Sequence, residues 1–464
     1  MTPADGAVDG SFRDPSGFVF WKDGILYRQV NSGYREHYDL LTASGLAAEL
    51  QAEGMLVGHE ECSLDLAPAA GAYRLIRPDP VSFVSYPYEW CFSQLKDAAL
   101  LTLAIQKKAM ARGMSLKDAS AYNVQFFHGR PVLIDTLSFE KYPEERPWVA
   151  YRQFCQHFLA PLALMACRDV RLSQLSRLHL DGVPLDLAAA LLPGRTRLRF
   201  SLLAHIHLHA RSQKHFADKP LAGRGRSMSR FALLALIHSL EAAVGRLRWQ
   251  PRATEWADYY DQTNYSGPAL AGKEKLLGDI LRALQPRQVW DIGANTGVFS
   301  RLASRAGIPT VAIDSDPAAV EKNYRQCRRD NEKFLLPLLA DITNPSPGSG
   351  WENRERRSLL QRGPADIVLA LALVHHLAIA NNLPLARIAG FFSRICSTLV
   401  IEFVPKSDSQ VQRLLASRED IFPGFHREGF EGEFLRFFTI ERREAICGSE
   451  RILYVMRSRG MAGG

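Results

Sequence analysis

The sequence predicts an α/β protein, with a doubly wound and mostly parallel sheet in the C-terminal half and an α+β domain before it. Two observations support this. After Pro251, short apolar segments alternate regularly with helical patterns, which is typical of a parallel sheet covered by helices. Before residue 250 strand and helix patterns are mixed, and 464 residues suffice for two or three domains. We therefore predict two domains, residues 1–245 and 246–464, with a linker near Gly223–Ser229.

The C-terminal half is expected to begin with a helix and then to alternate strands with helices. Pro317 suits the first turn of one of these helices. Residues 366–371 are nearly all apolar, as expected of a strand that is covered on both faces. The expected elements are helix 271–284, strand 288–292, helix 299–306, strand 310–313, a helix from 317, strands 335–339 and 366–371, helix 385–394, strand 397–403, and an antiparallel pair 436–442 and 451–456.

A glycine-rich turn, DIGANTG, follows the first strand of this sheet, from Asp291 to Gly297. Gly293 and Gly297 allow the backbone to turn sharply and to lie close to a ligand. Open parallel sheets bind their ligands beyond the carboxyl ends of the strands, which is where this turn lies. A plain tight turn without a ligand is the alternative.

Two more acidic residues end the next strands along the chain. Asp314 is placed to accept hydrogen bonds from both hydroxyls of a ribose, as the acidic residue of dinucleotide sites does. Asp341 is placed to meet an adenine amino group, with Ile342 against the ring. Aspartate also forms turns at strand ends, so each of these residues has a structural alternative.

The segments VWDIGANTG, VAIDSDPAAV, LLADITNP and DIVLALALVHHL together resemble the class I S-adenosylmethionine-dependent methyltransferases, over residues 255–458. The resemblance implies a Rossmann-like sheet of seven strands with a reversed last hairpin, and S-adenosylmethionine as methyl donor. DITNPSPGSGW and IEFVPK further resemble a bacterial group that includes a nodulation-associated protein of rhizobia. The implied cofactor-binding residues are Asp291, Gly293, Asn295, Gly297, Asp314, Asp341 and Ile342.

Methyl transfer needs an aligned nucleophile and, for a hydroxyl or amine, a group that removes a proton. His375 and His376 follow the fourth strand and are both candidates for this base, since the pKa of histidine lies near neutrality. Glu402, at the end of the fifth strand, is a second candidate for substrate contact or proton transfer. The aromatic segment Trp256–Ser266 could cover the site as a lid or could simply pack as a helix. The acceptor is not indicated by the sequence.

The N-terminal half carries a pattern that resembles protein kinases and small-molecule phosphotransferases. Asp118 and Asn123 are five residues apart, and Asp135 follows at the end of an apolar strand. In those families the first Asp orients the accepting hydroxyl, while Asn and the last Asp hold magnesium. The sequence departs from the pattern at Lys117, which replaces an Arg, and in lacking a G-x-G-x-x-G loop. Lys22 and Arg28 are poor substitutes for the usual lysine.

Three functions are therefore considered. The first is a methyltransferase acting on a hydroxyl or amine of a small molecule, glycan or protein. The second is a bifunctional protein, in which a kinase-like domain with Mg-ATP acts on the same substrate, such as a glycan. The third is a non-catalytic regulatory protein with a degenerate kinase-like module.

The net charge of +8 allows an anionic partner, but a mixed solvated surface explains it equally, and we do not expect nucleic acid. Seven cysteines without a CxxC pair predict neither a disulfide framework nor a zinc knuckle. We expect reduced thiols, a cytoplasmic location and no transmembrane segment. His205 and His209 share a helix face without a nearby carboxylate, so we expect no metal there.

Overall fold

The structure is a computed structural model that describes residues 5–211, 227–251, 267–416 and 418–460. Internal contacts divide the chain into two units. One unit comprises Met1–Gln250 together with the short segment Gly350–Glu355, and the other comprises Pro251–Ser349 and Arg356–Gly464. Most of the linker expected at 223–229 and the aromatic segment 256–266 lie outside the described residues.

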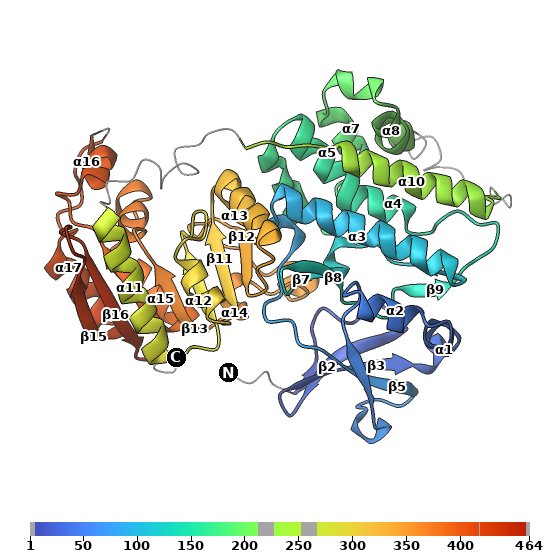
Figure 1. The fold of residues 1–464 in the computed structure, drawn as a ribbon, viewed down its shortest axis with the longest axis horizontal. Coiled ribbons are helices and arrows are strands. Elements are labelled where there is room, and N and C mark those ends of the chain that lie inside the picture. Colours follow the sequence, from blue (N-terminus) through green and yellow to red (C-terminus); the bar gives the residue numbers. More distant parts are fainter. Residues whose placement is uncertain (1–4, 212–226, 252–266, 417, 461–464) are drawn as a thin grey trace. The chain divides into compact units, whose positions relative to one another are not determined.

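The N-terminal unit begins with an antiparallel sheet of five strands in the order β1-β2-β3-β5-β4, with two helices between β3 and β4 (Figure 1). A tight hairpin joins β2 to β3, and its turn residues Asp23 and Gly24 both adopt positive φ angles. The bounds are β1 Gly6–Ala7, β2 Gly17–Lys22, β3 Ile25–Asn31, α1 Arg35–Ala43, α2 Leu46–Ala52, β4 His59–Cys62 and β5 Ala72–Pro78.

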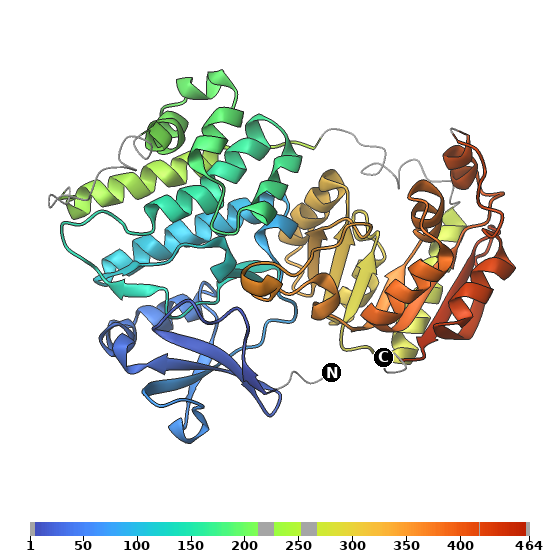
Figure 2. The same cartoon turned by 180° about the vertical axis from the view of Figure 1, so that it is seen from behind.

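The rest of this unit is mostly helical. A long helix, α3 (Phe92–Ala111), lies beside α10 (Arg230–Arg246) in both views (Figures 1 and 2). Two short strand pairs follow α3. The bounds are β6 Met114–Leu116 paired with β9 Phe139–Lys141, β7 Val124–Phe127 paired with β8 Arg130–Leu133, α4 Tyr151–Phe154, α5 Ala160–Cys167, α6 Leu175–Leu178, α7 Leu185–Leu191 and α8 Phe200–Leu202.

The C-terminal unit is built on a sheet of seven strands in the order β12-β11-β10-β13-β14-β16-β15. Only β16 runs against its neighbours, so the last hairpin is reversed as predicted. This is the class I methyltransferase fold. The chain leaves β10 with β11 on one side and β13 on the other, which makes the end of β10 the switch point of the sheet. The bounds are β10 Val289–Ile292, β11 Thr310–Asp314, β12 Leu335–Leu339, β13 Ala365–Ala370, β14 Cys396–Phe403, β15 Phe438–Ala445 and β16 Ile452–Ser458.

Helices cover this sheet and close its core. On one face, Leu277 of α11 and Phe299 pack against Leu369, Val400 and Val455 of the strands, and all five are buried. The strands and helices expected from the sequence are found with ends shifted by a few residues. The bounds are α11 Gly267–Leu284, α12 Ser300–Arg305, α13 Pro317–Arg329, α14 Leu359–Arg362, α15 Leu385–Ile395, α16 Ser409–Leu415 and α17 Arg427–Leu435.

Two further features bear on the sequence predictions. Among the described residues, no helix combines the length and apolarity needed to cross a bilayer. His205 is buried, and its ring nitrogens bond to the hydroxyls of Tyr151 and Ser239, at 2.8 and 2.9 Å. It is therefore part of the packed interior of the N-terminal unit.

Candidate active site

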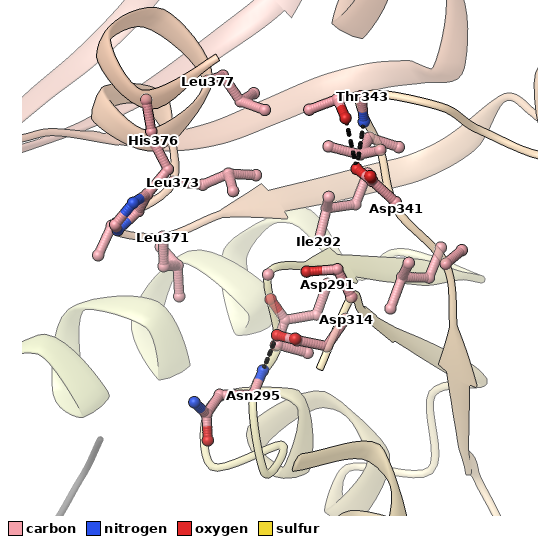
Figure 3. A pocket seen from close by; sticks show the side chains of 18 of the residues that line it. Asp291, Ile292, Asn295, Asp314, Asp341, Thr343, Leu371, Leu373, His376 and Leu377 are labelled. Carbon is pink, nitrogen blue, oxygen red and sulfur yellow. Dashed lines mark hydrogen bonds between the residues drawn. The ribbon is translucent and has the colours of Figure 1, made fainter. Parts of the chain in front are cut away.

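A cavity of about 320 Å³ lies at the carboxyl ends of the central strands of the C-terminal unit (Figure 3). Its volume is in the range of pockets that hold small ligands and cofactors. Four of the first five strands of the sheet contribute to its walls, because parallel strands end at the same edge. The lining includes Lys273, Asp291, Gly293, Asn295, Asp314, Asp341, Ile342, Leu371, Leu373, His376 and Leu377.

The glycine-rich turn forms one wall of this cavity. Gly293, Asn295 and Gly297 all adopt positive φ angles of 77°, 51° and 80°, which bend the chain directly from β10 into α12. Gly297 does not line the cavity. A Cβ there would lie 2.6 Å from Nδ2 of Asn323, so Gly297 serves the turn by letting α13 approach it. The first five residues of the motif, Asp291 to Asn295, line the cavity.

The two acids at the ends of β10 and β11 both lie in this wall, Asp291 buried and Asp314 half-buried. Asp291 accepts a hydrogen bond from Oγ of Ser300 at 2.6 Å. Asp314 accepts bonds from the backbone N–H groups of Asn295, at 2.7 Å, and Asp316, at 2.8 Å. Burial raises the pKa of each carboxyl to about 6, although these hydrogen bonds oppose the shift. Both groups are therefore ionised at neutral pH and titrate just below it.

Asp341 and Ile342 follow β12 and form the opposite part of the lining. Asp341 is exposed, and its Oδ1 accepts bonds from the backbone N–H and the hydroxyl of Thr343, at 2.8 and 2.7 Å. This Asx turn, drawn with dashed lines in Figure 3, holds the loop in place at the cavity. The structure thus brings Asp291, Asp314 and Asp341 around one cavity.

The two candidate histidines have different positions. His376 lines the cavity, together with Leu373 and Leu377 (Figure 3). His375 does not line the cavity: it is 1% exposed, its ring centre lies 4.1 Å from that of His376, and its Nδ1 has no hydrogen-bond partner among the described residues. Burial lowers the pKa of His376 to about 4, so its imidazole is neutral at physiological pH. The placement favours His376 over His375 as a base.

Glu402 also lies behind the wall of the cavity. Its Oε2 accepts bonds from Nζ of Lys273 at 2.5 Å and from the backbone N–H of Ala372 at 3.0 Å. Arg451 contacts its Oε1 at 3.4 Å, and in turn binds Asp408 at 2.7 Å. Glu402 was a candidate for substrate contact or proton transfer, and the structure places it outside the cavity lining. The carboxylate of Glu402 thus links α11, β14 and the segment after β13 through one buried network of ion pairs and hydrogen bonds.

Lys273 is a site residue that the sequence analysis missed. It lines the cavity, is 1% exposed, and its ammonium group lies 4.4 Å from the centre of the Phe299 ring. Burial lowers the pKa of Lys273, while Glu402 opposes this shift. A signal was present, since Lys273 shares the apolar helix face of Leu277 and Ile280, where a charged residue needs a buried partner.

The three kinase-like residues also come together, in the N-terminal unit. Asn123 donates to Oγ of Ser138 at 3.2 Å, and that hydroxyl donates to Oδ2 of Asp135 at 2.5 Å. Asp118 accepts from the backbone N–H of Ser120 at 2.9 Å, and its carboxyl lies close enough to Asn123 and Asp135 for both to influence its pKa. Burial raises the pKa of Asp118. The pattern read from the sequence therefore describes one connected cluster.

Among curated proteins, the chain is similar to the nodulation protein NoeA of Rhizobium meliloti (strain 1021). The two are 35% identical over 460 residues, which cover 97% of this chain and 96% of NoeA. No protein-family model matches the chain.

Solved structures show weaker likenesses. The bifunctional kinase-methyltransferase WbdD matches at 14% identity and a TM-score of 0.31, over 43% of this chain and 41% of WbdD, so the match spans less than half of that protein. The N-methyltransferase NodS from Bradyrhizobium japonicum WM9 matches at 14% identity and a TM-score of 0.30, over 42% of this chain and 98% of NodS. The magnesium protoporphyrin IX methyltransferase ChlM from Synechocystis PCC 6803, with bound SAH, matches at 18% identity and a TM-score of 0.31, over 44% and 93%. Likenesses at this level do not bear on activity.

Proposed function

The chain belongs to the family of the nodulation protein NoeA, and on the geometry of its cavity we propose that it is an S-adenosylmethionine-dependent methyltransferase. The observation that supports this most is the grouping of three strand-end acids, Asp291, Asp314 and Asp341, with a glycine-rich turn around one cavity. S-adenosylmethionine supplies an activated methyl group, so the chain has only to bind the donor, orient the acceptor and accept a proton.

The residues fit an adenosyl group. Both oxygens of Asp314 already accept one backbone N–H each, and the second lone pair of each oxygen remains available to ribose hydroxyls. Ile342 offers an apolar surface to the adenine ring, and the carboxylate of Asp341 can accept a hydrogen bond from the amino group at the edge of that ring. Asp291 places a buried negative charge where the methionine part, with its amino group, would lie.

The acceptor is proposed to enter along the wall formed by Leu371, Leu373 and Leu377, which carries His376. These side chains exclude water from the reacting centre, so the neutral imidazole of His376 is the titratable group on this wall that can take the proton. A hydroxyl or an amine both suit this arrangement, because each loses one proton when it is methylated.

Donor binding is tested by isothermal titration of the full chain with S-adenosylmethionine. Asp314→Ala is expected to weaken binding at least tenfold, because a ribose loses its acceptor and Asn295 N–H loses its partner. Asp330→Ala is the matched control, since Asp330 is an exposed acid that directly follows α13, outside the cavity lining, and should leave affinity unchanged. Equal affinity of the wild type, Asp314→Ala and Asp330→Ala for the donor would contradict the proposed binding site.

Catalysis is tested by incubating cell extract with labelled methyl donor, with and without the protein, and searching for a labelled product by mass spectrometry. Once the acceptor is known, His376→Gln is expected to lower the rate by about 100-fold or more, with unchanged donor affinity. His375→Gln is the control for the buried neighbour. Donor binding without any labelled product would instead favour a non-catalytic regulatory protein.

A further inference from the structure

The kinase-like cluster of the N-terminal unit contains its own cation. We propose that Arg28 takes the place of the divalent metal ion there, so that this unit does not bind magnesium nucleotide for phosphoryl transfer. The proposal rests on the side chains around Asp135, and it is independent of the methyltransferase proposal.

Arg28 lies in the position from which a kinase lysine acts. It is on β3, the central strand of the sheet, paired with Val19 of β2 and Ile76 of β5. In active kinases the β3 lysine forms an ion pair with a glutamate from the following helix, and the last Asp of the pattern holds magnesium. Both arrangements must be present for transfer.

Neither arrangement is found among the described residues. The Arg28 guanidinium pairs directly with Oδ1 of Asp135 at 2.5 Å, and the two side chains are only 12% and 14% exposed. The acids of the helix pair are used elsewhere. Glu49 binds Lys108 and Arg112, and Glu36 binds Lys141. A single ion pair therefore replaces both the Lys–Glu pair and the Asp–metal contact.

The oxygens of Asp135 are also engaged by other donors. Oδ1 accepts the backbone N–H of Leu137 at 3.1 Å, in addition to Arg28. Oδ2 accepts the hydroxyl of Ser138, which is held by Asn123. Asn123 and Asp135, the two residues expected to hold magnesium, are thus both bonded to the hydroxyl of Ser138. A metal ion would have to displace a buried guanidinium from a carboxylate, which leaves a costly unpaired charge.

The turn that precedes β2 is fixed against the same cluster. Nζ of Lys117 donates to Oγ of Ser16 at 2.7 Å and lies 3.4 Å from Oδ2 of Asp14. Gly17 is so close to β3 that a Cβ would lie 2.1 Å from the carbonyl oxygen of Gln29 and 2.8 Å from Leu137. In protein kinases the corresponding turn is a glycine-rich loop that covers the phosphates of ATP. Here the turn is bonded to Lys117 and so is held against the cluster.

Metal binding is measured directly, by electron paramagnetic resonance of Mn²⁺ in the presence of a non-hydrolysable ATP analogue. The wild-type chain is expected to take up no more Mn²⁺ than Asp135→Asn, because Asp135 is already neutralised. Arg28→Met removes the built-in cation but keeps a long side chain, so the carboxylate of Asp135 loses its cationic partner and can take metal together with Asn123. This variant is expected to bind Mn²⁺ at least tenfold more tightly than the wild type. The double variant Arg28→Met/Asp135→Asn is the matched control and should lose the gain.

Two results would overturn the proposal. One is wild-type Mn²⁺ binding that depends on Asp135, which would show that the ion pair opens to admit metal. The other is a folded Arg28→Met variant that gains no binding, which would show that Arg28 is not what excludes it. If Arg28→Met fails to fold, as judged by circular dichroism, the comparison of wild type with Asp135→Asn still decides the question.

Discussion

The carboxyls of Asp291 and Asp314 make both donor binding and stability depend on pH, in opposite directions. Burial raises the pKa of each from 3.8 in the unfolded chain to about 6. The folded state therefore binds these protons more readily than the unfolded state. Above pH 6 both groups are ionised in the folded state, and the free energy of unfolding is lowered by its full amount. As the pH falls from 6 toward 4 the folded state takes up these protons, and the free energy of unfolding rises again.

Donor binding needs the same groups as carboxylates. We expect the affinity for S-adenosylmethionine to fall by about tenfold for each of the two carboxyls, so by about 100-fold in all, between pH 7 and pH 5, because a carboxyl with a pKa of about 6 is then mostly protonated. Titration calorimetry over this range measures the slope. Asp314→Asn should bind weakly at pH 7 already and show a shallower slope. An affinity that stays constant from pH 7 to pH 5 would contradict the placement of these acids against the ligand.

At the scale of elements, the β10–α12 turn depends on glycine at one position. Gly297 has a φ of 80°, and a Cβ would lie 2.6 Å from Asn323 and 2.9 Å from Arg301. Gly297→Ala is expected to lower the free energy of unfolding by about 1–2 kcal/mol or more and to weaken donor binding, since the turn must move. Urea unfolding measures this. The control is Gly278→Ala in α11, where the added methyl has room and helix propensity should raise stability by about 1 kcal/mol.

The contact between α11 and β14 depends on the buried pair of Lys273 and Glu402. Lys273→Met leaves Glu402 with Arg451 as its remaining charged partner, so we expect a loss of about 3 kcal/mol in the free energy of unfolding. Lys273→Met/Glu402→Gln should recover part of it, because no buried carboxylate is then short of a partner. Lys275→Met, on the exposed side of the same helix, should change little. A loss no larger for Lys273→Met than for Lys275→Met would show that the pair is not stabilising.

The elements of the C-terminal sheet were predictable because each depends on a local pattern. β12 is found at Leu335–Leu339, as expected, because a short apolar run between polar turns usually forms a buried strand. The acids at strand ends were predictable for the same reason. What could not be predicted is set by contacts distant in sequence. Nothing in the local sequence distinguishes His375 from His376, although only His376 lines the cavity in the folded chain. The pairing of Arg28 with Asp135 likewise joins residues far apart in the chain.

At the scale of the whole molecule, each of the two units has its own buried core, and the donor cavity lies within only one of them. Binding to the folded state stabilises whatever unfolds together with the site, by about 2.7 kcal/mol when the ligand is at 100 times its Kd. We therefore expect saturating S-adenosylmethionine to slow hydrogen exchange about 100-fold at the slowest amides of β10, β13 and β14.

The amides of α3 and β3 in the N-terminal unit should exchange at unchanged rates in the same experiment, because no part of their core touches the ligand. Mass spectrometry of peptic fragments from the full chain reads both sets at once, so each sample carries its own control. The Asp314→Ala variant should abolish the slowing in β10, β13 and β14 without altering α3. Equal protection of α3 and β10 by the donor would mean that the two units unfold as one cooperative structure, and that donor binding at one sheet edge is transmitted to the kinase-like cluster around Asp135.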